Sequence, residues 1–140
     1  MNQDTIMPAP AATGRISKAM PRLGTGLTVL AVLFLAFDAI TKVIRVTPVM
    51  EACQKMGISP GMAAGIGILL LACTTLYVIP RTAILGAILL TGYLGGAAAA
   101  HVITRSGAFP TAFAIGFGLL AWAGLGLRDP RLVRWILVRQ

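Results

Sequence analysis

The chain has 140 residues, of which 57% are hydrophobic and only 11% are charged. A water-soluble domain usually has about a quarter of its residues charged, so this composition excludes a soluble helical bundle and indicates a protein whose surface faces lipid. The net charge of +8 does not indicate nucleic-acid binding, because the lysines and arginines lie between apolar runs, as membrane topology requires, rather than on one face of a polar fold.

Residues 1–22 are predicted to form a disordered, basic N-terminal tail. Their first part is rich in small residues and proline, and Arg15, Lys18 and Arg22 precede the first apolar run. This arrangement resembles the start of a signal peptide, but the run that follows is too long and no cleavage site closes it. We therefore expect the run to remain as a membrane anchor.

Four apolar runs follow, and each is long enough as a helix to cross a bilayer core of about 30 Å. They cover approximately residues 23–44, 61–79, 83–104 and 109–127. Together they define a transmembrane domain over residues 23–128. The predicted fold is all-α, an integral membrane bundle of four transmembrane helices.

The segments outside the spans carry helix start and stop signals. "TPVMEACQKMG" has a proline near its beginning and Gly57 at its end, which predicts a short amphipathic helix between the first two spans. Ser59 followed by Pro60 is typical of a helix start, and "IPRT" predicts a tight turn between the second and third spans. Residues 129–140 are expected to form a basic amphipathic C-terminal tail.

Basic residues are distributed unequally between the two ends of the predicted bundle. Arg45, Lys55 and Arg105 lie at one end, with Lys42 at its edge, and the other eight basic residues lie at the end that holds both termini. Because cytoplasmic loops carry the excess of lysine and arginine, both termini are predicted to be cytoplasmic.

Small residues recur at a spacing of four in two of the spans. Gly61 and Gly65 form one such pair, and Gly92 and Gly96 form another. This spacing allows close approach of helices in lipid. We expect these glycines to pack helices within one bundle, and the alternative is a contact face of a homo-oligomer.

A polar cluster is predicted at the external mouth of the bundle. Asp38 and Lys42 are four residues apart near the outer end of the first span, so they can pair on one helix face, and His101 lies near the outer end of the third span. Thr91 and Tyr93 lie deeper in that span. Ionisable residues within membranes usually face the bundle interior and pair with one another. A structural salt bridge and a binding or proton-handling site are both compatible with this pattern.

The remaining chemistry-bearing residues give weaker signals. Tyr77 is expected to be an interface anchor, Cys73 to be a small buried apolar residue, and Cys53 to lie in a loop, with no disulfide between the two cysteines. The spacing of histidine and cysteine does not suit zinc, and no motif for haem, flavin or an iron–sulfur cluster is present. No catalytic residue and no metal ligand is predicted, and the cofactor stays unknown, with a quinone left open.

Three stretches, "LFLAFDAITK", "GISPGMAAGIGILLLACTTLY" and "IPRTAILGAILLTGYLGGAAAAH", resemble the DoxX-like family of small bacterial membrane proteins. The resemblance extends from Leu23 to Arg131. It implies a four-helix transmembrane bundle in a bacterial inner membrane. The family's recurring polar positions correspond to the five residues of the predicted polar cluster. The family often has a glutamate in the second span, as G-I-L-E-L, where this chain has Leu70.

The wider DoxX group takes its name from a subunit of a thiosulfate:quinone oxidoreductase. From the sequence we therefore expect a non-catalytic membrane subunit, or a binder of a lipid-like or quinone-like small molecule, in contact with the lipid bilayer. The alternative is a membrane redox subunit that acts with a quinone. A second copy of the chain and a membrane redox protein are the partners left open.

Overall fold

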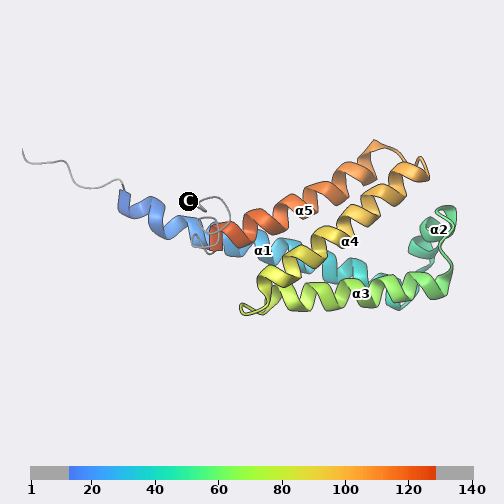
Figure 1. Cartoon of the computed structure of the whole chain (residues 1–140), viewed down its shortest axis with the longest axis horizontal. Helices are drawn as coiled ribbons and strands as arrows, with labels where there is room; N and C mark the ends of the chain where they lie inside the picture. The colour runs from blue at the N-terminus through green and yellow to red at the C-terminus, as the bar shows by residue number, and fades with distance from the viewer. Residues whose placement is uncertain (1–12, 129–140) are drawn as a thin grey trace, which may run out of the picture.

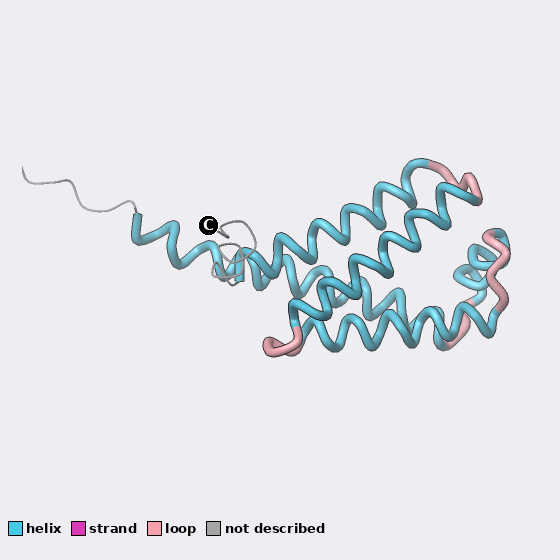
Figure 2. Tube along the Cα trace, viewed as in Figure 1, coloured by secondary structure: helices cyan, strands magenta, loops and turns pink. Residues whose placement is uncertain are grey.

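The computed structural model describes residues 13–128 of the chain, and these residues form five α-helices joined by short turns (Figures 1 and 2). The helices are α1 (Thr13–Val43), α2 (Thr47–Lys55), α3 (Pro60–Val78), α4 (Ala83–Ile103) and α5 (Ala108–Arg128). No strand occurs within the described range. The structure confirms the all-α fold, with a short helix between the first two spans. The predicted C-terminal tail and residues 1–12 of the N-terminal tail lie outside the described residues.

Four of the helices have the length and apolar composition of membrane spans. They are Met20–Val43 within α1, and the whole of α3, α4 and α5. Large apolar side chains on their outer faces are exposed, among them Leu33, Phe37 and Leu119. A water-soluble protein would bury such side chains, whereas lipid accepts them.

Helix α1 begins ten residues before the predicted end of the tail, so residues 13–22 are helical. The helix passes through Pro21, which lacks the backbone N–H needed for one intrahelical hydrogen bond. The Thr25 hydroxyl donates a hydrogen bond of 2.9 Å to the Pro21 carbonyl oxygen, one turn earlier in the helix. Most residues around Pro21 are fair to good helix formers, so the helix of the first span continues back through this segment.

The four long helices form a ring in which α1 contacts α3 and α5, and α4 contacts the same two helices. Two glycines allow α3 to lie close to both α4 and α1. A Cβ atom on Gly86 would lie 2.3 Å from the backbone nitrogen of Tyr77, and one on Gly67 would lie 2.8 Å from the carbonyl oxygen of Ala39. No side chain fits at either position, so the α3–α4 and α1–α3 contacts both depend on glycine.

The glycines that were predicted to pack the bundle do not do so. Gly61, Gly65, Gly92 and Gly96 are exposed, and a Cβ atom at any of them would meet nothing within 4 Å. Their spacing is correct for helix packing, but no neighbouring helix lies close to any of the four. The prediction of packing within one bundle is therefore wrong for these four residues.

Tyr77 lies in the core rather than at the membrane interface, which corrects the prediction that it is an interface anchor. Its side chain is 0% exposed. Its hydroxyl donates a 2.7 Å hydrogen bond to the carbonyl oxygen of Ala121 on α5, and lies 3.4 Å from the hydroxyl oxygen of Thr28 on α1. Tyr77 therefore joins three helices at one level of the bundle.

Helix α2 and the turn between α4 and α5 lie at one end of the bundle, which we call the α2 end (Figure 1). The turn between α3 and α4 lies at the other end, near the end of α5. Ser59 caps α3 as predicted, since its side chain accepts a hydrogen bond from the backbone of Met62. Arg45 and Arg105, with φ of 57° and 51°, end α1 and α4 in the left-handed conformation that commonly closes helices. Both spans therefore stop sharply at the α2 end.

Candidate functional site

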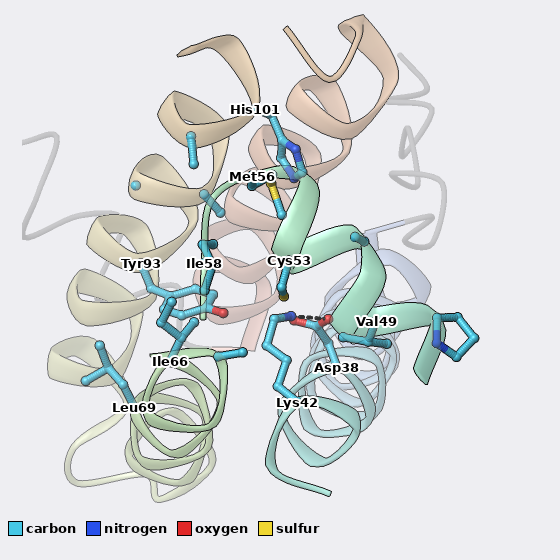
Figure 3. A pocket seen from close by; sticks show the side chains of 16 residues that line it. Asp38, Lys42, Val49, Cys53, Met56, Ile58, Ile66, Leu69, Tyr93 and His101 are labelled. Carbon is cyan, nitrogen blue, oxygen red and sulfur yellow. Dashed lines mark hydrogen bonds and ion pairs between the residues drawn. The ribbon is translucent and has the colours of Figure 1, made fainter. Parts of the chain in front are cut away.

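A cavity of about 540 Å³ lies at the α2 end, between α1, α3 and α4 and beneath α2 (Figure 3). We call it the α2 cavity. Most of its lining is apolar, and the side chains with a polar oxygen or nitrogen atom are those of Asp38, Lys42, Tyr93 and His101. The other lining residues are Pro48, Val49, Ala52, Cys53, Met56, Ile58, Ala63, Ile66, Leu69, Gly96, Ala97 and Ala100.

The cavity exists because α3 and α4 separate toward the α2 end. They are in backbone contact at Gly86, near their connecting turn, and diverge from there (Figure 1). Where they diverge, α4 presents Gly96, Ala97 and Ala100 to the space between them. These side chains are too small to fill it, and the short helix α2 covers it only in part.

Asp38 and Lys42 form the ion pair that their spacing predicts. Lys42 Nζ lies 2.5 Å from Asp38 Oδ1, and the two side chains are 16% and 32% exposed, respectively. Both come from the last two turns of α1. Because each charge offsets the other, the pair reduces the free-energy cost of holding either group inside a membrane protein.

Tyr93 and His101 reach the same cavity from α4, two turns apart on one helix face. Figure 3 shows the Tyr93 side chain extending from α4 toward the interior of the cavity. The Nδ1 atom of His101 is buried and has no hydrogen-bond partner among the described residues. An unpartnered polar atom of this kind costs free energy, so His101 has hydrogen-bonding capacity that the described protein groups do not use.

Thr91 does not line the α2 cavity, although it was predicted as part of the same cluster. Its hydroxyl donates to the carbonyl oxygen of Ala87 and accepts a 2.8 Å hydrogen bond from Nε1 of Trp122 on α5. Two residues separate Thr91 from Tyr93, which places them on different faces of α4. Thr91 therefore contributes to the α4–α5 contact, and this hydrogen bond satisfies the indole N–H of the partly buried Trp122.

A second, smaller cavity of about 130 Å³ lies on the other side of Asp38 and His101, between α1, α4 and α5. Three phenylalanines line it. The rings of Phe34 and Phe117 are stacked with centroids 4.3 Å apart, and those of Phe113 and Phe117 are tilted with centroids 4.8 Å apart. Asp38 and His101 line both cavities. On one side of Asp38 and His101 lies the broad α2 cavity, which is bounded by aliphatic groups. On the other side lies the narrow cavity, which is lined by aromatic rings.

Cys53 is a cavity residue that the sequence did not reveal, since it was expected in a loop. It lies on α2, is 3% exposed and is a free thiol, as is Cys73. Burial raises the pKa of the Cys53 thiol above its ordinary value, the nearby Lys42 opposes this, and Asp38 adds to it. The signal that could have located Cys53 is its spacing from Met50, since the two buried side chains of α2 are three residues apart.

Leu70, which stands where the resemblance to the DoxX-like family implies a glutamate, does not line the α2 cavity. It is 0% exposed and belongs to the hydrophobic core with Leu35, Ala39 and Leu90. The described residues also contain no group of three or more histidine, cysteine, aspartate or glutamate side chains that could hold a metal ion. The polar groups of the site are therefore the ion pair, one phenol and one imidazole.

Comparison with known protein families gives one match, to the model of the DoxX-like family, over residues 26–124. The chain belongs to the DoxX-like family. The matched region contains every residue that lines the α2 cavity of this DoxX-like protein. Neither the curated proteins nor the solved structures give a match.

Proposed function

We propose that this DoxX-like protein is a non-catalytic membrane protein that binds a lipid-like or quinone-like small molecule in the α2 cavity, alone or as a subunit of a larger membrane assembly. The observation that carries the proposal is a largely apolar cavity of about 540 Å³ with four polar side chains. Binding sites for small molecules commonly have volumes of about 300–1,000 Å³ and combine apolar walls with a few polar groups that orient the ligand.

The roles of the four polar residues follow from their contacts. Asp38 and Lys42 neutralise each other, so their main contribution is a fixed, polar wall. His101 Nδ1 has no hydrogen-bond partner among the described residues, and the Tyr93 side chain lines the same cavity, so each can hydrogen-bond the polar part of a ligand. Thr91 lies outside the cavity and takes no part in the proposed binding.

A redox subunit that acts with a quinone is the second candidate. It is favoured by one observation, which is that three groups able to exchange protons, Asp38, Tyr93 and His101, line one cavity. An imidazole can accept a proton at one ring nitrogen and donate one from the other, so His101 would be the group that transfers the proton. This candidate requires turnover with an added quinone and a partner that supplies electrons.

We further propose that the protein lies in a bacterial inner membrane with both termini in the cytoplasm. Arg81 lies in the turn between α3 and α4, and Arg128 is the last residue of α5, so both are at the end of the bundle opposite α2. The α2 end, with Arg45 and Arg105, would then face outward. A C-terminal fusion to a phosphatase that is active only in the periplasm should be inactive, and high activity would contradict this orientation.

Native mass spectrometry of the protein released from membranes tests the binding proposal. We expect a bound small molecule with the wild-type chain, a smaller bound fraction with Tyr93→Phe and His101→Ala, and no change with Thr75→Val, an exposed hydroxyl on α3. A wild-type protein without any bound molecule, or equal retention by all variants, would contradict the proposal. The same spectra report whether the protein is a homo-oligomer. A retained quinone together with quinone-dependent activity that is lost in a folded His101→Ala protein would favour the redox candidate.

A further inference from the structure

The α2 cavity reaches the surface of the protein between α3 and α4. Two of its lining residues on these helices are exposed, Leu69 with 55% of its surface and Gly96 on the facing helix. A Cβ atom on Gly96 would meet nothing within 4 Å. The cavity wall is therefore thin or open at this place, which we call the α3–α4 opening.

The α3–α4 opening faces hydrocarbon rather than water. Leu69 and Gly96 both lie within helices that have the length and composition of membrane spans. Their neighbours on the same helices, Ile68, Leu71 and Leu89, are large apolar residues with 40–59% of their surface exposed. Such a surface is stable only against lipid chains, so a molecule that passes the opening comes from the bilayer.

The charges that line the cavity indicate what kind of head group it accepts. Lys42 already pairs with Asp38, and Arg45, Glu51 and Arg105 do not line the cavity. A phosphate or ammonium head group would therefore have to break the ion pair to find a counter-charge, at a cost of several kcal/mol in a membrane protein. A neutral head group can instead use the Tyr93 hydroxyl and the His101 imidazole.

We propose that the ligand enters sideways from the membrane through the α3–α4 opening, and that it is a lipid-soluble molecule with an uncharged, hydrogen-bonding head and a single apolar chain. This inference rests on the proposed binding function, to which it adds the route and the ligand class. The head lies near Tyr93 and His101, and the chain passes between Leu69 and Gly96 into the bilayer. The charged head of a phospholipid does not suit this cavity, because the two charges that line it already pair with each other.

The thiol of Cys53 is a natural reporter of this route because it lines the cavity. In a Cys73→Ala protein in lipid vesicles, we expect Cys53 to react with a membrane-soluble pyrene maleimide and far more slowly with a sulfonated maleimide. Gly96→Phe should slow the pyrene reaction by roughly tenfold, which corresponds to about 1.4 kcal/mol of added barrier. The matched control is Gly92→Phe, one turn away on the same exposed face and outside the cavity lining.

A second variant gives a change of the opposite sign. Leu69→Ala enlarges the opening and should speed the reaction with the pyrene maleimide alone. A variant that merely fails to fold would not speed the reaction of the membrane-soluble reagent specifically. Equal rates with the two maleimides, or no difference between Gly96→Phe and Gly92→Phe, would overturn the lateral route and indicate entry from water beside α2. Ligand retention in mass spectra is a separate measurement, so lateral access without a bound molecule would contradict the binding function and leave the route intact.

Discussion

Lys42 Nζ lies 2.5 Å from Asp38 Oδ1, and both side chains line the α2 cavity. The pair is therefore at once a part of helix α1 and a part of the wall of the proposed binding site. The two roles can be tested separately. The stability of the protein depends on whether one charge loses its partner, whereas binding depends on the polar groups that line the cavity.

Breaking this pair from one side should destabilise the protein. Asp38→Asn leaves the ammonium of Lys42 without its partner, at an expected cost of about 3 kcal/mol. Adding Lys42→Met removes that ammonium and should restore most of the loss, as measured by thermal unfolding in detergent. Glu51→Gln, at an exposed acidic residue of α2, is the control and should change little. A double variant that is stable but loses the bound molecule would assign the pair to binding, and one that keeps the molecule would make the pair structural only.

Gly86 should not tolerate a side chain. The Cβ of Gly86→Ala would lie 2.3 Å from the backbone nitrogen of Tyr77, so α3 and α4 would have to move apart, at a cost of about 1–3 kcal/mol. Gly92→Ala on the same helix meets nothing within 4 Å and should keep the wild-type melting temperature. Equal melting temperatures for the two variants would show that α3 and α4 do not approach as closely as described.

Tyr77→Phe should weaken the junction of three helices. The substitution leaves the ring in the core and removes the hydrogen bond to the Ala121 carbonyl oxygen. Interhelical hydrogen bonds in membrane proteins contribute about 0.6–2 kcal/mol, and we expect a loss in this range by thermal unfolding. Thr75→Val, which removes an exposed hydroxyl that bonds only within its own helix, should cost less. A stabilised Tyr77→Phe protein would contradict the described hydrogen bond.

Restoring the family's glutamate should not create a functional site in this chain. Leu70 is fully buried among aliphatic residues, so Leu70→Glu would place a carboxyl group where no described cation lies in contact with it. We expect a loss of several kcal/mol and lower yields of folded protein by size-exclusion chromatography. Leu70→Met keeps the volume and the apolar character and should be tolerated. A folded Leu70→Glu protein with stronger ligand retention would mean that position 70 faces the cavity after all.

The rate at which Cys53 reacts with maleimide should rise at higher pH than the rate for an ordinary cysteine. Burial raises the pKa of this thiol, and only the thiolate is nucleophilic. Its labelling rate should therefore continue to rise at pH values where the rate for an ordinary cysteine has levelled off. The reference is a Gln54→Cys thiol in a Cys53→Ala, Cys73→Ala chain, since position 54 is exposed on the same helix. Identical pH profiles for the two thiols would show that Cys53 is open to water.

Local patterns were sufficient for some of these features. Four apolar runs, the cap at Ser59 and the stop at Gly57 define where helices begin and end, because these signals act within a few residues of the chain. The pairing of Asp38 with Lys42 was equally accessible, since a spacing of four brings two side chains together on any α-helix. The spacing of eight between Tyr93 and His101 places them on one face in the same way.

The rotation of each helix about its own axis was decided only by the tertiary structure. In a soluble helix an apolar stripe marks the buried face, but these spans are apolar on all sides, so the sequence did not distinguish Gly67 and Gly86, which pack, from Gly61 and Gly92, which face outward. The burial of Tyr77 depended on the same rotation. So did the α2 cavity, because it arises where α3 and α4 diverge, and the angle between two helices is set by contacts between residues far apart in the chain.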